Sequence, residues 1–381
     1  MTRVLHVQKV SGISGSEAHL LSVLPLLRRR GWDARMVVLD EGEDGATRFA
    51  EELRARDVPT TRLRMRLDAD PLLFARLAAT IRRARPEVVH THLVHADLLG
   101  LPAATLARVP VRISTKHGFN AFRLRRGFGA ADRGVGRLAD VDVAISRGLA
   151  EHLAAAEGFD VDAFEIVHYG IAPGPEAPTP PRDPRLLAVG RLIEIKGLDT
   201  LLRALAAARA DVPAMTLDLA GSGPVERDLR HLAAQLGLED AVRFLGHVSP
   251  VAPLLEEALA VVVPSRGEGF GMVALEAMER SRAVVASAVG GLPELVLEGE
   301  TGLLVPPDDV EALRVALVRV ATDPDATAAM GAAGRGRALE EFPVERPAER
   351  LDAIYRAALA RRNRSTAAPA STASSTSHGT R

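Results

Sequence analysis

The chain of 381 residues contains no cysteine. Disulfide bonds and thiolate ligands for a metal are therefore excluded. The sequence also lacks an apolar run of about 18 residues, the length that spans a bilayer. Its first ten residues, MTRVLHVQKV, alternate apolar and polar side chains where a signal peptide would be continuously apolar. These absences predict a cytoplasmic protein.

Lysine is scarce as well, since only three of the 48 basic residues are lysines: Lys9, Lys116 and Lys196. A lysine carries a compact point charge, whereas an arginine offers a planar fork of donors. Each of the three follows an apolar, strand-like segment, and the ends of such strands border a cleft in parallel-sheet proteins. The three lysines are therefore candidates for positions that need a point charge.

The net charge of −1 conceals a difference between the two halves of the chain. Residues 1–181 carry 25 basic and 22 acidic side chains, whereas residues 182–360 carry 19 and 27. One basic and aromatic segment contains Arg123, Arg125, Arg126, Arg133 and Arg137 with Phe119, Phe122 and Phe128. Such a surface could make a weak peripheral contact with the inner face of an anionic membrane, or bind an acidic acceptor. A solvated arginine-rich face is the simpler interpretation, and nothing indicates nucleic-acid binding.

The length of the chain exceeds what one hydrophobic core usually supports, so two domains are expected. Short apolar segments alternate with segments of helical periodicity, which predicts an α/β fold with two parallel, helix-covered sheets. The proline-rich stretch APGPEAPTPPRDP separates the two series. We therefore expect a Rossmann-like domain at 1–172, a linker at 173–184, a second Rossmann-like domain at 185–342, a helix at 343–360 that packs back toward the first domain, and a disordered tail at 361–381.

The segment AVGRLIEIKGLDTLL indicates a site for an anion. Its strand ends just before Arg191 and an amphipathic helix begins near Leu198, so Lys196 stands at the positive end of the helix dipole. A cation is unfavourable there by about 0.3–1 kcal/mol unless an anion also binds. Because Arg191 supplies a second cation, a phosphate group is the favoured ligand. The alternative is that Asp199, in the first helical turn, offsets the lysine.

A second anion site is predicted in the segment PSRGEGFGMVALEAM, which begins at Pro264. Gly269 and Gly271 permit a sharp turn between an apolar strand and a helix. The carboxylates of Glu268 and Glu276 bracket the N–H groups that open this helix, and a diphosphate would fit between them, with hydroxyl-rich groups at each end. These N–H groups belong to Phe270, Gly271 and Met272. Two solvated glutamates beside a helix start are the alternative.

Together these segments resemble the retaining glycosyltransferases of family 4, which have the GT-B fold of two Rossmann-like domains facing across a cleft. The resemblance extends to about residue 355. Its early segments are GISGSEAHLLSVLPLLRRRG, HTHLVHADLLG, STKHG and AISRGL. Its later and more specific segments are VGRLIEIKG, LAGSGP, FLGHV, the two glutamates separated by seven residues, and ASAVGGLPELVLEGETGLLVPP.

The resemblance implies donor-binding roles for four side chains. Arg191 and Lys196 would hold the diphosphate of a nucleoside-diphosphate sugar, with UDP as the expected carrier and GDP next. Glu268 would accept hydrogen bonds from the transferred sugar, and Glu276 from the ribose. Retention in this family is ascribed to front-face attack with the leaving phosphate as the base, so Glu268 is not expected to be a nucleophile. The acceptor, which the sequence does not identify, would contact the N-terminal domain.

The resemblance also implies contacts from the backbone and from the opposite wall of the cleft. The N–H groups of Phe270, Gly271 and Met272 would bind sugar and phosphate, Gly15 would face the diphosphate, and His117 would lie near the anomeric centre. Departure of a nucleoside diphosphate builds negative charge, which cations and a helix N-terminus can stabilise. No metal and no cofactor other than the donor substrate are therefore expected.

The chain departs from the family pattern at two places. Ser14 precedes Gly15 where the family often has two adjacent glycines. The tetrapeptide YGIA, which begins at Tyr169, stands where Asn-Gly-Val/Ile-Asp is frequent. Both departures concern the sugar and acceptor side of the cleft, whereas the segments expected to bind the diphosphate match the pattern.

Two Asp-x-Asp pairs resemble the metal-binding element of the other large transferase fold. They are Asp140-Val-Asp142, which opens an apolar strand, and Asp160-Val-Asp162, which lies in an expected loop. Carboxylates at a strand edge and in a loop explain both pairs better than a cation does. Dependence on manganese or magnesium is therefore not expected.

His90, His92 and His95 raise the alternative of a zinc site through their His-x-His spacing. A protein zinc site needs three or four ligands that converge on the ion. No carboxylate or further histidine is placed in the sequence to complete such a set. A metal site is therefore disfavoured, and the family resemblance implies that these histidines line the floor of the cleft.

Three other classes of protein fit the sequence less well. Gly221-Ser-Gly223 is a fragment of a dinucleotide fingerprint, but Glu226 takes the place of the third glycine, which disfavours an NAD-dependent dehydrogenase. A nucleotide-sugar 2-epimerase on the same scaffold and a non-catalytic sugar-binding protein remain as alternatives. Incubation with a labelled nucleotide sugar distinguishes them, because transfer requires an acceptor, epimerisation does not, and a binding protein turns nothing over.

Overall fold

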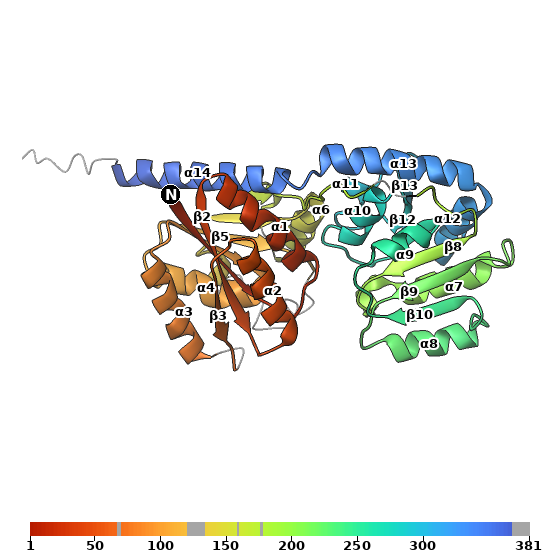
Figure 1. The fold of residues 1–381 in the computed structure, drawn as a ribbon, viewed down its shortest axis with the longest axis horizontal. Helices are drawn as coiled ribbons and strands as arrows, with labels where there is room; N and C mark the ends of the chain where they lie inside the picture. Colours follow the sequence, from red (N-terminus) through yellow and green to blue (C-terminus); the bar gives the residue numbers. More distant parts are fainter. Residues whose placement is uncertain (67–69, 120–133, 158–159, 176–177, 368–381) are drawn as a thin grey trace, which may run out of the picture.

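The structure is a computed structural model in which two α/β domains lie side by side (Figure 1). It describes residues 1–66, 70–119, 134–157, 160–175 and 178–367. Two helices run along one side of the molecule, α13 (Pro324–Glu341) over the C-terminal domain and α14 (Arg346–Ala367) over the N-terminal domain. Among the described residues, no helix combines the length and the apolar composition that crossing a membrane requires.

Seven parallel strands form the sheet of the N-terminal domain, in the order β3-β2-β1-β4-β5-β6-β7. Their bounds are β1 Thr2–Lys9, β2 Trp32–Asp40, β3 Thr60–Arg64, β4 Val88–His92, β5 Val111–Lys116, β6 Val141–Ala144 and β7 Phe164–Ile166. The central strands are buried along most of their length because helices cover both faces of the sheet. The order reverses at β1, where β4 pairs with its free edge, so the sheet is doubly wound.

The helices of this domain divide between the two faces of the sheet. Their bounds are α1 Gly15–Arg29, α2 Asp44–Ala55, α3 Pro71–Ala84, α4 Leu93–Leu106 and α6 Arg147–Glu157. α1 and α2 pack on one face together with α14, and α3 and α4 pack on the other. The start of α3 is fixed by Asp70, whose carboxylate accepts from the N–H groups of Leu72 and Leu73 at 2.9 and 3.1 Å.

Six parallel strands form the sheet of the C-terminal domain, in the order β10-β9-β8-β11-β12-β13. Their bounds are β8 Arg185–Val189, β9 Thr216–Ala220, β10 Val242–Gly246, β11 Ala260–Val263, β12 Ala283–Ser287 and β13 Gly302–Val305. The helices are α7 Leu198–Ala208, α8 Glu226–Gln235, α9 Ala252–Glu257, α10 Met272–Glu279, α11 Leu292–Leu295, α12 Val310–Thr322 and α13. The predicted α/β fold with two parallel, Rossmann-like sheets is thereby confirmed.

Helix α14 returns from the C-terminal domain to complete the core of the N-terminal domain. Tyr355 is fully buried, with its ring 5.2 Å from that of Trp32, and the indole N–H of Trp32 donates to Asp352 at 2.7 Å. The helix begins at Arg346 and continues to Ala367, so it ends later than expected. The assignment of residues 361–367 to a disordered tail is wrong, because arginine favours helix and its charge suits the negative end of the helix dipole. Residues 368–381 lie outside the described residues.

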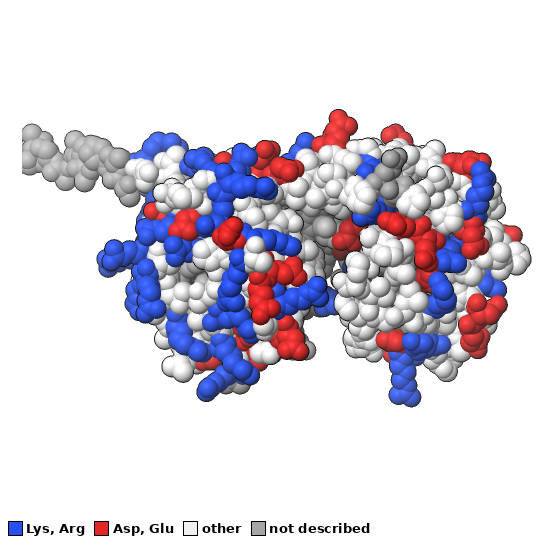
Figure 2. Space-filling model, viewed as in Figure 1, with Lys and Arg blue, Asp and Glu red and all other residues white. Residues whose placement is uncertain are grey.

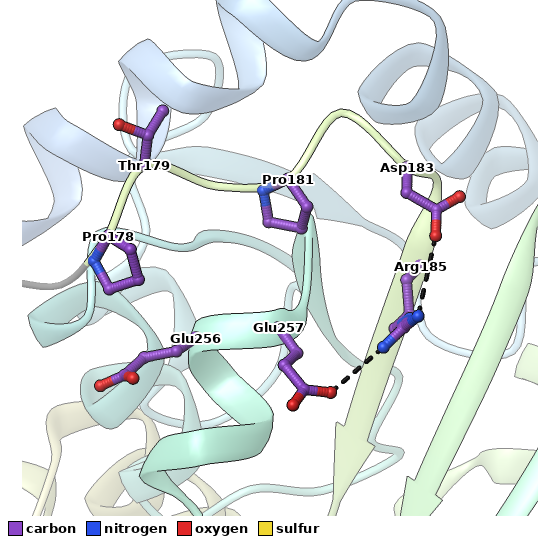
Figure 3. A pocket seen from close by; sticks show the side chains of 7 residues that line it. All are labelled: Pro178, Thr179, Pro181, Asp183, Arg185, Glu256 and Glu257. Carbon is purple, nitrogen blue, oxygen red and sulfur yellow. Dashed lines mark hydrogen bonds and ion pairs between the residues drawn. The ribbon is translucent and has the colours of Figure 1, made fainter.

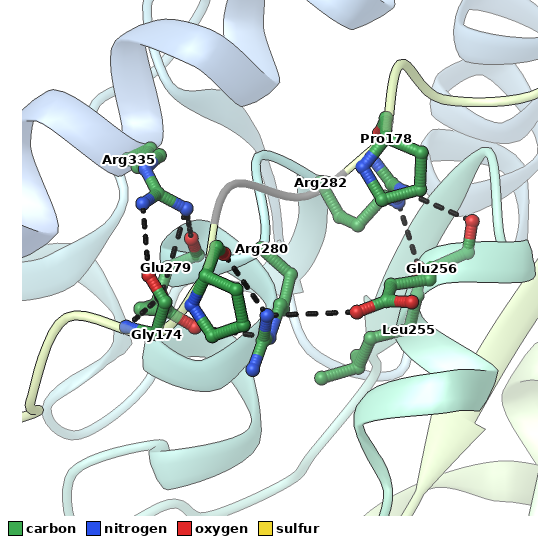
Figure 4. A network of polar contacts seen from close by, with 9 residues as sticks. Gly174, Pro178, Leu255, Glu256, Glu279, Arg280, Arg282 and Arg335 are labelled. Carbon is green, nitrogen blue, oxygen red and sulfur yellow. Dashed lines mark hydrogen bonds and ion pairs between the residues drawn. The ribbon is translucent and has the colours of Figure 1, made fainter.

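The proline-rich linker is held against the C-terminal domain by arginines (Figure 4). The buried guanidinium of Arg282 donates to the carbonyl oxygen of Pro178 at 3.0 Å and to two carbonyl oxygens of α9 at 2.7 and 2.8 Å. Arg335, on α13, donates to the carbonyl oxygen of Gly174 at 3.3 Å. Where it is described, the segment that joins the domains is therefore attached to the C-terminal domain.

The main chain passes between the two domains twice, at neighbouring points. The N–H of Ile171 donates to the carbonyl oxygen of Phe342 at 2.8 Å, and Ile171 forms an isolated parallel bridge with Pro343. Gly170 lies so close to Pro343 that a side chain there would meet its carbonyl oxygen at 2.5 Å. Because both crossings lie together, they are the natural place for a hinge between the domains.

Candidate active site

The candidate site lies where the carboxyl ends of the two sheets meet. Polar contacts join the domains there: the hydroxyl of Ser146 donates to the carbonyl oxygen of Gly269 at 2.5 Å. The N–H groups of Arg147 and Gly148, at the start of α6, donate to the carboxylate of Glu294 at 3.1 and 2.9 Å. Open α/β sheets bind their ligands at this edge, so the two domains together border one site.

Lys196 and Glu268 form an ion pair, with Nζ 2.6 Å from Oε2. The hydroxyl of Ser265 donates to the same carboxylate oxygen at 3.2 Å. Lys196 follows strand β8 and Glu268 follows β11, and these two strands are neighbours in the sheet. Side chains that are 72 positions apart in the sequence therefore meet at its edge.

The turn that carries Lys196 is packed closely against the loop that carries Glu268. This turn is the short 3-10 helix η3 (Glu194–Lys196), and it ends at Gly197. Gly197 has a left-handed backbone with φ of 61°, and a Cβ atom there would collide with the carbonyl oxygen of Pro264. Any other residue at this position would push the two loops apart.

Arg266 is a further residue of the site, which the sequence did not single out. Its guanidinium donates to both carboxylate oxygens of Asp199 at 2.8 and 2.9 Å, to the carbonyl oxygen of Glu194 at 2.6 Å, and lies 2.8 Å from Asp308. This pairing lowers the pKa of Asp199. Asp199 therefore neutralises Arg266, and the alternative in which it offsets Lys196 is wrong.

Arg191 and Lys196 lie at the same strand end. Arg191 follows Gly190 directly after β8, and its side chain is exposed. Within the described residues, its guanidinium has neither a hydrogen-bond nor an ionic partner. The side chain of Lys196 passes over Gly190, since a Cβ atom there would lie 3.8 Å from Cε of the lysine. A cation without a partner thus stands next to one that is paired with a carboxylate.

Two helix N-termini, one from each domain, approach each other at the site. Gly271 caps α10 with φ of 105°, so Phe270, Gly271 and Met272 form the turn that opens this helix. Gly15 is the first residue of α1, and a Cβ atom on it would lie 3.5 Å from Cγ of Met272. The positive ends of two helix dipoles therefore face the same region, an arrangement that favours an anion.

The serine that replaces a family glycine in the first loop has a structural role. The hydroxyl of Ser14 donates to the carboxylate of Glu17 at 2.6 Å, and its N–H donates to the same oxygen at 3.1 Å. Glu17 thereby satisfies donors at the start of α1, as in a capping box. The departure at Ser14 is thus compatible with the close approach of Gly15 to the other domain.

Glu276 lies one turn inside α10 and is half-buried. Burial, with a smaller contribution from the charge of Glu279, raises the pKa of Glu276 to about 7. Within the part of the chain that the structure describes, its carboxylate has no hydrogen-bond donor or cation beside it. A partly buried acceptor without a donor favours a ligand that brings one.

His117 follows strand β5 and lies against the glycine turn of the C-terminal domain. A Cβ atom on Gly269 would lie 2.9 Å from the carbonyl oxygen of His117. Both ring nitrogens are already in contact with other side chains: Nε2 lies 2.9 Å from Nδ1 of His92, and Nδ1 lies 2.5 Å from the hydroxyl of Tyr169. Burial and the charge of Lys116 lower the pKa of His117 to about 3. The ring is therefore neutral and fully hydrogen-bonded within the protein.

The histidine group contains a member that the sequence did not reveal. His6, on β1, pairs in register with His90 on β4, and ligand atoms of His6, His90 and His92 lie within 4.8 Å of one another. The expectation that no further histidine accompanies His90 and His92 is wrong, because β1 and β4 are neighbours in the sheet despite their distance in sequence. His95 is not a member of this group.

The Asp-x-Asp carboxylates have structural partners. Asp140 accepts from the guanidinium of Arg112 at 2.9 and 3.0 Å, and Asp142 lies 3.8 Å from Lys116. Asp160 accepts from the N–H of Asp162 at 3.0 Å and caps a short 3-10 helix, η2 (Val161–Ala163), where a loop was expected. These contacts agree with the interpretation of both pairs as structural carboxylates.

Two cavities lie away from the site. One of about 310 Å³ adjoins the linker and the start of β8, where Arg185 binds Glu257 and Asp183 at 3.1 and 3.8 Å (Figure 3). It is at the amino end of the sheet, opposite the edge that carries Lys196. The other, of about 400 Å³, lies between the end of α1 and the start of α14 and is lined by Arg29, Arg30 and Glu345 among others.

Part of the basic and aromatic segment lies outside the described residues, namely Arg123, Arg125, Arg126 and Arg133 with Phe122 and Phe128. Phe119 faces inward, since its ring packs 4.3 Å from that of His152 and its Cε2 lies 3.2 Å from a Cβ atom built on Gly290. Phe119 is thus partly buried, and the surface contact of this segment stays a prediction. Lysine and arginine side chains are spread over the visible face of the N-terminal domain, with acidic ones among them (Figure 2).

Comparison with known proteins identifies the family. Residues 13–174 match the model of Glycosyltransferase Family 4, and residues 183–323 match that of Glycosyl transferases group 1. A glycogen synthase of Mycobacterium tuberculosis is 34% identical over 296 residues, which are 73% of this chain and 70% of that protein. The chain belongs to glycosyltransferase family 4. This glycosyltransferase is also 35% identical over 231 residues, 55% of its chain and 60% of the relative, to a GDP-mannose-dependent alpha-(1-6)-phosphatidylinositol monomannoside mannosyltransferase of Mycolicibacterium smegmatis.

Solved structures share the fold of this family 4 glycosyltransferase. The Anabaena protein HepE, in complex with UDP and glucose, superposes with a TM-score of 0.81 and 20% identity, over 94% of this chain and all of the other. The sucrose-phosphate synthase of Thermosynechococcus elongatus gives a TM-score of 0.76 with 25% identity, over 94% of this chain and all of the other. The expected GT-B fold and glycosyltransferase class are thereby confirmed.

Proposed function

We propose that the protein is a retaining, metal-independent glycosyltransferase that moves a sugar from a nucleoside-diphosphate sugar to an acceptor. One observation carries the proposal: the Lys196–Glu268 ion pair and the facing starts of α1 and α10 lie together at the edge where the domains meet. The region offers cations and helix N-termini for a diphosphate, and a carboxylate next to them for a sugar.

The diphosphate would be held by Arg191 and Lys196 and by the N–H groups that open α10. Arg191 has no ionic partner among the described residues and is free to bind a phosphate. Lys196 would exchange part of its contact with Glu268 for a second phosphate oxygen. Gly15 gives the backbone of α1 its close approach from the other side. The leaving nucleoside diphosphate gains negative charge in the transition state, so these groups stabilise that state more than the substrate.

The sugar would face Glu268 and the ribose would face Glu276. Glu268 is held by Lys196 and Ser265, and its remaining lone pairs would accept from sugar hydroxyls. Glu276, with its raised pKa, is stabilised as a carboxylate when ribose hydroxyls donate to it. Because Glu268 is already bound to a cation and a hydroxyl, its role is to orient and stabilise the sugar, and the leaving phosphate serves as the base in a front-face attack.

We take UDP as the first carrier to test and GDP as the second. The UDP complexes of structural neighbours support the former, and the GDP-mannose-dependent relatives support the latter. The acceptor would bind against the N-terminal domain. Residues 1–181 carry 25 basic and 22 acidic side chains, and this net positive charge also suits a weak contact with anionic lipid.

A donor screen tests the function directly. The protein is incubated with UDP-, GDP-, ADP- and dTDP-sugars, and release of the nucleoside diphosphate is followed in EDTA without an acceptor. We expect slow hydrolysis of one class of donor, none with the Glu268→Gln variant, and no stimulation by manganese. Hydrolysis that EDTA abolishes would contradict the metal-independent mechanism, and equal activity of the variant would contradict the site.

A further inference from the structure

A continuous series of hydrogen-bonding side chains runs through the core of the N-terminal domain and ends at the candidate active site. Its members come from strands β1, β4 and β5, from the residues that follow β5 and β7, and from helix α14. We name this series the histidine chain. In order, its members are Thr115, His90, Tyr355, His6, His92, His117 and Tyr169.

The half of the histidine chain near the active site contains three short links. The hydroxyl of Tyr169 lies 2.5 Å from Nδ1 of His117. Nε2 of His117 lies 2.9 Å from Nδ1 of His92, and Nε2 of His92 lies 2.9 Å from Nδ1 of His6. The same pattern, Nε2 of one ring against Nδ1 of the next, is thus repeated.

The other half connects this series to helix α14. Nε2 of His6 lies 3.5 Å from the hydroxyl of Tyr355, which is the longest link. That hydroxyl lies 2.7 Å from Nδ1 of His90, and Nε2 of His90 lies 2.6 Å from the hydroxyl of Thr115. Within the histidine chain, His90 is therefore connected to the other three histidines only through Tyr355.

The ring geometry indicates hydrogen bonds and not a shared metal ion. The rings of His6 and His92 are nearly parallel, at 7°, and their centroids are 5.2 Å apart while the facing nitrogens are 2.9 Å apart. The centroid distance exceeds the nitrogen distance by about twice the distance from the centre of an imidazole ring to one of its nitrogens. Both nitrogens therefore lie on the line that joins the two ring centroids. The rings of His92 and His117, with centroids 5.1 Å apart, have nearly the same end-on arrangement. Ligands of one metal would instead direct their nitrogens at a common point.

The histidines of the chain are neutral. Burial lowers the pKa of His6 and of His117 to about 3, and lowers the pKa of His90 and of His92 well below its usual value. A neutral imidazole carries one N–H, so one nitrogen donates and the other accepts. When two neighbouring rings are linked end to end, one nitrogen of the link must donate and the other must accept, so the tautomer of one ring determines the tautomer of the other.

Two proton orders satisfy every link of the chain and also give the proton of the buried Tyr355 hydroxyl an acceptor. In the first, the Tyr169 hydroxyl donates to His117, and His117, His92, His6 and His90 all carry their proton on Nε2. In the second, the Thr115 hydroxyl donates to His90, and all four rings carry their proton on Nδ1. A mixture within one molecule would place two donors or two lone pairs face to face in the core, or would leave the proton of the buried Tyr355 hydroxyl without an acceptor. Each buried group left unsatisfied costs about 1–3 kcal/mol.

We propose that His92, His6 and Tyr355 are positioning residues that join the tautomer of His117, and the direction of the Tyr169 hydroxyl, to one common proton order that extends to α14. The proposal rests on the proposed function only in that His117 and Tyr169 border the donor site. Tyr169 lies beside Gly15 and Phe270, at the junction of the two domains. The second proton order leaves its hydroxyl proton available to a ligand, and the first directs that proton to His117.

Tautomers measured by NMR test the proposal on protein without substrate, so its failure is distinguishable from failure of the proposed function. Protein with ¹⁵N-labelled histidine is examined at pH 7, where the two ring ¹⁵N shifts of each residue report which nitrogen carries the proton. His6, His90, His92 and His117 are assigned by single substitutions. We expect one common tautomer for the four rings. Different tautomers, or a cationic ring among them, would overturn the proposal.

The Tyr355→Phe variant cuts the chain and has a distinct expected result. Phenylalanine offers neither a donor nor an acceptor, so His6 and His90 each turn an unprotonated nitrogen toward it, because a buried donor without a partner is rarer than an acceptor without one. We expect His90 to carry its proton on Nε2 and the other three rings on Nδ1. The Ile354→Val variant, on the same buried turn of α14, should retain the wild-type tautomers. Four identical tautomers in Tyr355→Phe would overturn the coupling.

The Tyr169→Phe variant removes the hydroxyl at the other end of the histidine chain. It provides an independent test if the Tyr355→Phe variant does not fold. His117 then presents an unprotonated Nδ1 to the phenyl ring and carries its proton on Nε2. Each following ring of the histidine chain accepts a hydrogen bond on Nδ1 and therefore takes the same tautomer. We expect all four histidines to carry their proton on Nε2. As a test of the metal alternative, one equivalent of Co²⁺ should leave the shifts of the four rings unchanged. A tetrahedral cobalt spectrum that the His6→Phe variant loses would overturn the hydrogen-bonded chain.

Discussion

The two domains border one site but build their walls differently. The C-terminal domain uses residues of two loops that follow neighbouring strands, with the Lys196–Glu268 ion pair at their junction. The N-terminal domain uses a glycine turn at Gly15 and a core of linked histidines that reaches from His6 to Tyr355. The first wall carries charged side chains, and the histidines of the second are neutral and hydrogen-bonded within the protein. Changes in the former should affect substrate directly, and changes in the latter should act through structure.

The largest effect on turnover is expected from Glu268→Ala. This variant removes the carboxylate that faces the sugar, so turnover should be abolished. It also frees Lys196 from its partner, so the affinity for nucleoside diphosphate should be retained or increased. Activity assays and calorimetry with UDP and GDP measure the two quantities. A loss of diphosphate affinity would place Glu268 at the phosphates and would contradict its role toward the sugar.

The largest effect on stability is expected in the N-terminal domain, from Lys116→Ala. Lys116 is 4% exposed, and its Nζ lies 2.7 Å from the fully buried carboxylate of Asp97. Removal of one partner leaves a buried charge, so the free energy of unfolding should fall by about 3–5 kcal/mol. Denaturant unfolding measures it. Lys9→Ala, which breaks a pair with the exposed Glu41, is the matched control and should change stability by less than about 1 kcal/mol.

The pH dependence of stability should depend on Glu276. Burial raises the pKa of this carboxyl from its ordinary value of 4.5 to about 7 in the folded protein, so wild type loses stability as pH rises from about 4.5 to above 7. Glu276→Gln removes this loss and should be more stable than wild type at pH 8 by about 2–3 kcal/mol, with no such advantage at pH 4. Thermal unfolding at the two pH values measures the difference. An equal gain at both would show that the carboxylate is not destabilised by burial.

The smallest of these effects is expected for Lys196→Ala. The affinity for nucleoside diphosphate should fall by about 1–3 kcal/mol, because one charge-assisted contact is lost while Arg191 and the helix N-termini remain. Isothermal titration with UDP and GDP measures it, with Lys9→Ala as the control for loss of a lysine at a strand end. An unchanged dissociation constant would remove Lys196 from the diphosphate site and would leave the charged wall to Arg191.

The sequence predicts the wall of the C-terminal domain better than that of the N-terminal domain. That Glu268 lies at the same edge as Arg191 and Lys196 could be anticipated, because short motifs after parallel strands meet at one edge. Arg266 was missed although it stands two residues before Glu268, since its partners are distant in the sequence: Asp199 lies in the first turn of α7, and Asp308 lies just before α12.

The contacts of the N-terminal wall could not be anticipated. His6 and Tyr355 are 349 positions apart, and their contact depends on the order of the strands and on where α14 returns. No local pattern encodes either. The same holds for Phe119, whose apolar ring fits a cleft as well as a surface, and for residues 361–367, where helix continues after the apolar pattern has ended.

The return of α14 to the N-terminal domain bears on how the protein is made. The residues that complete the first core, among them Leu351, Ile354 and Tyr355, are synthesised only after the whole C-terminal domain. The N-terminal domain therefore emerges from the ribosome with an open apolar face beside α1 and must wait for the rest of the chain. A fragment that stops at residue 172 should bind molecular chaperones or aggregate, and a separately added peptide of residues 344–367 should rescue it.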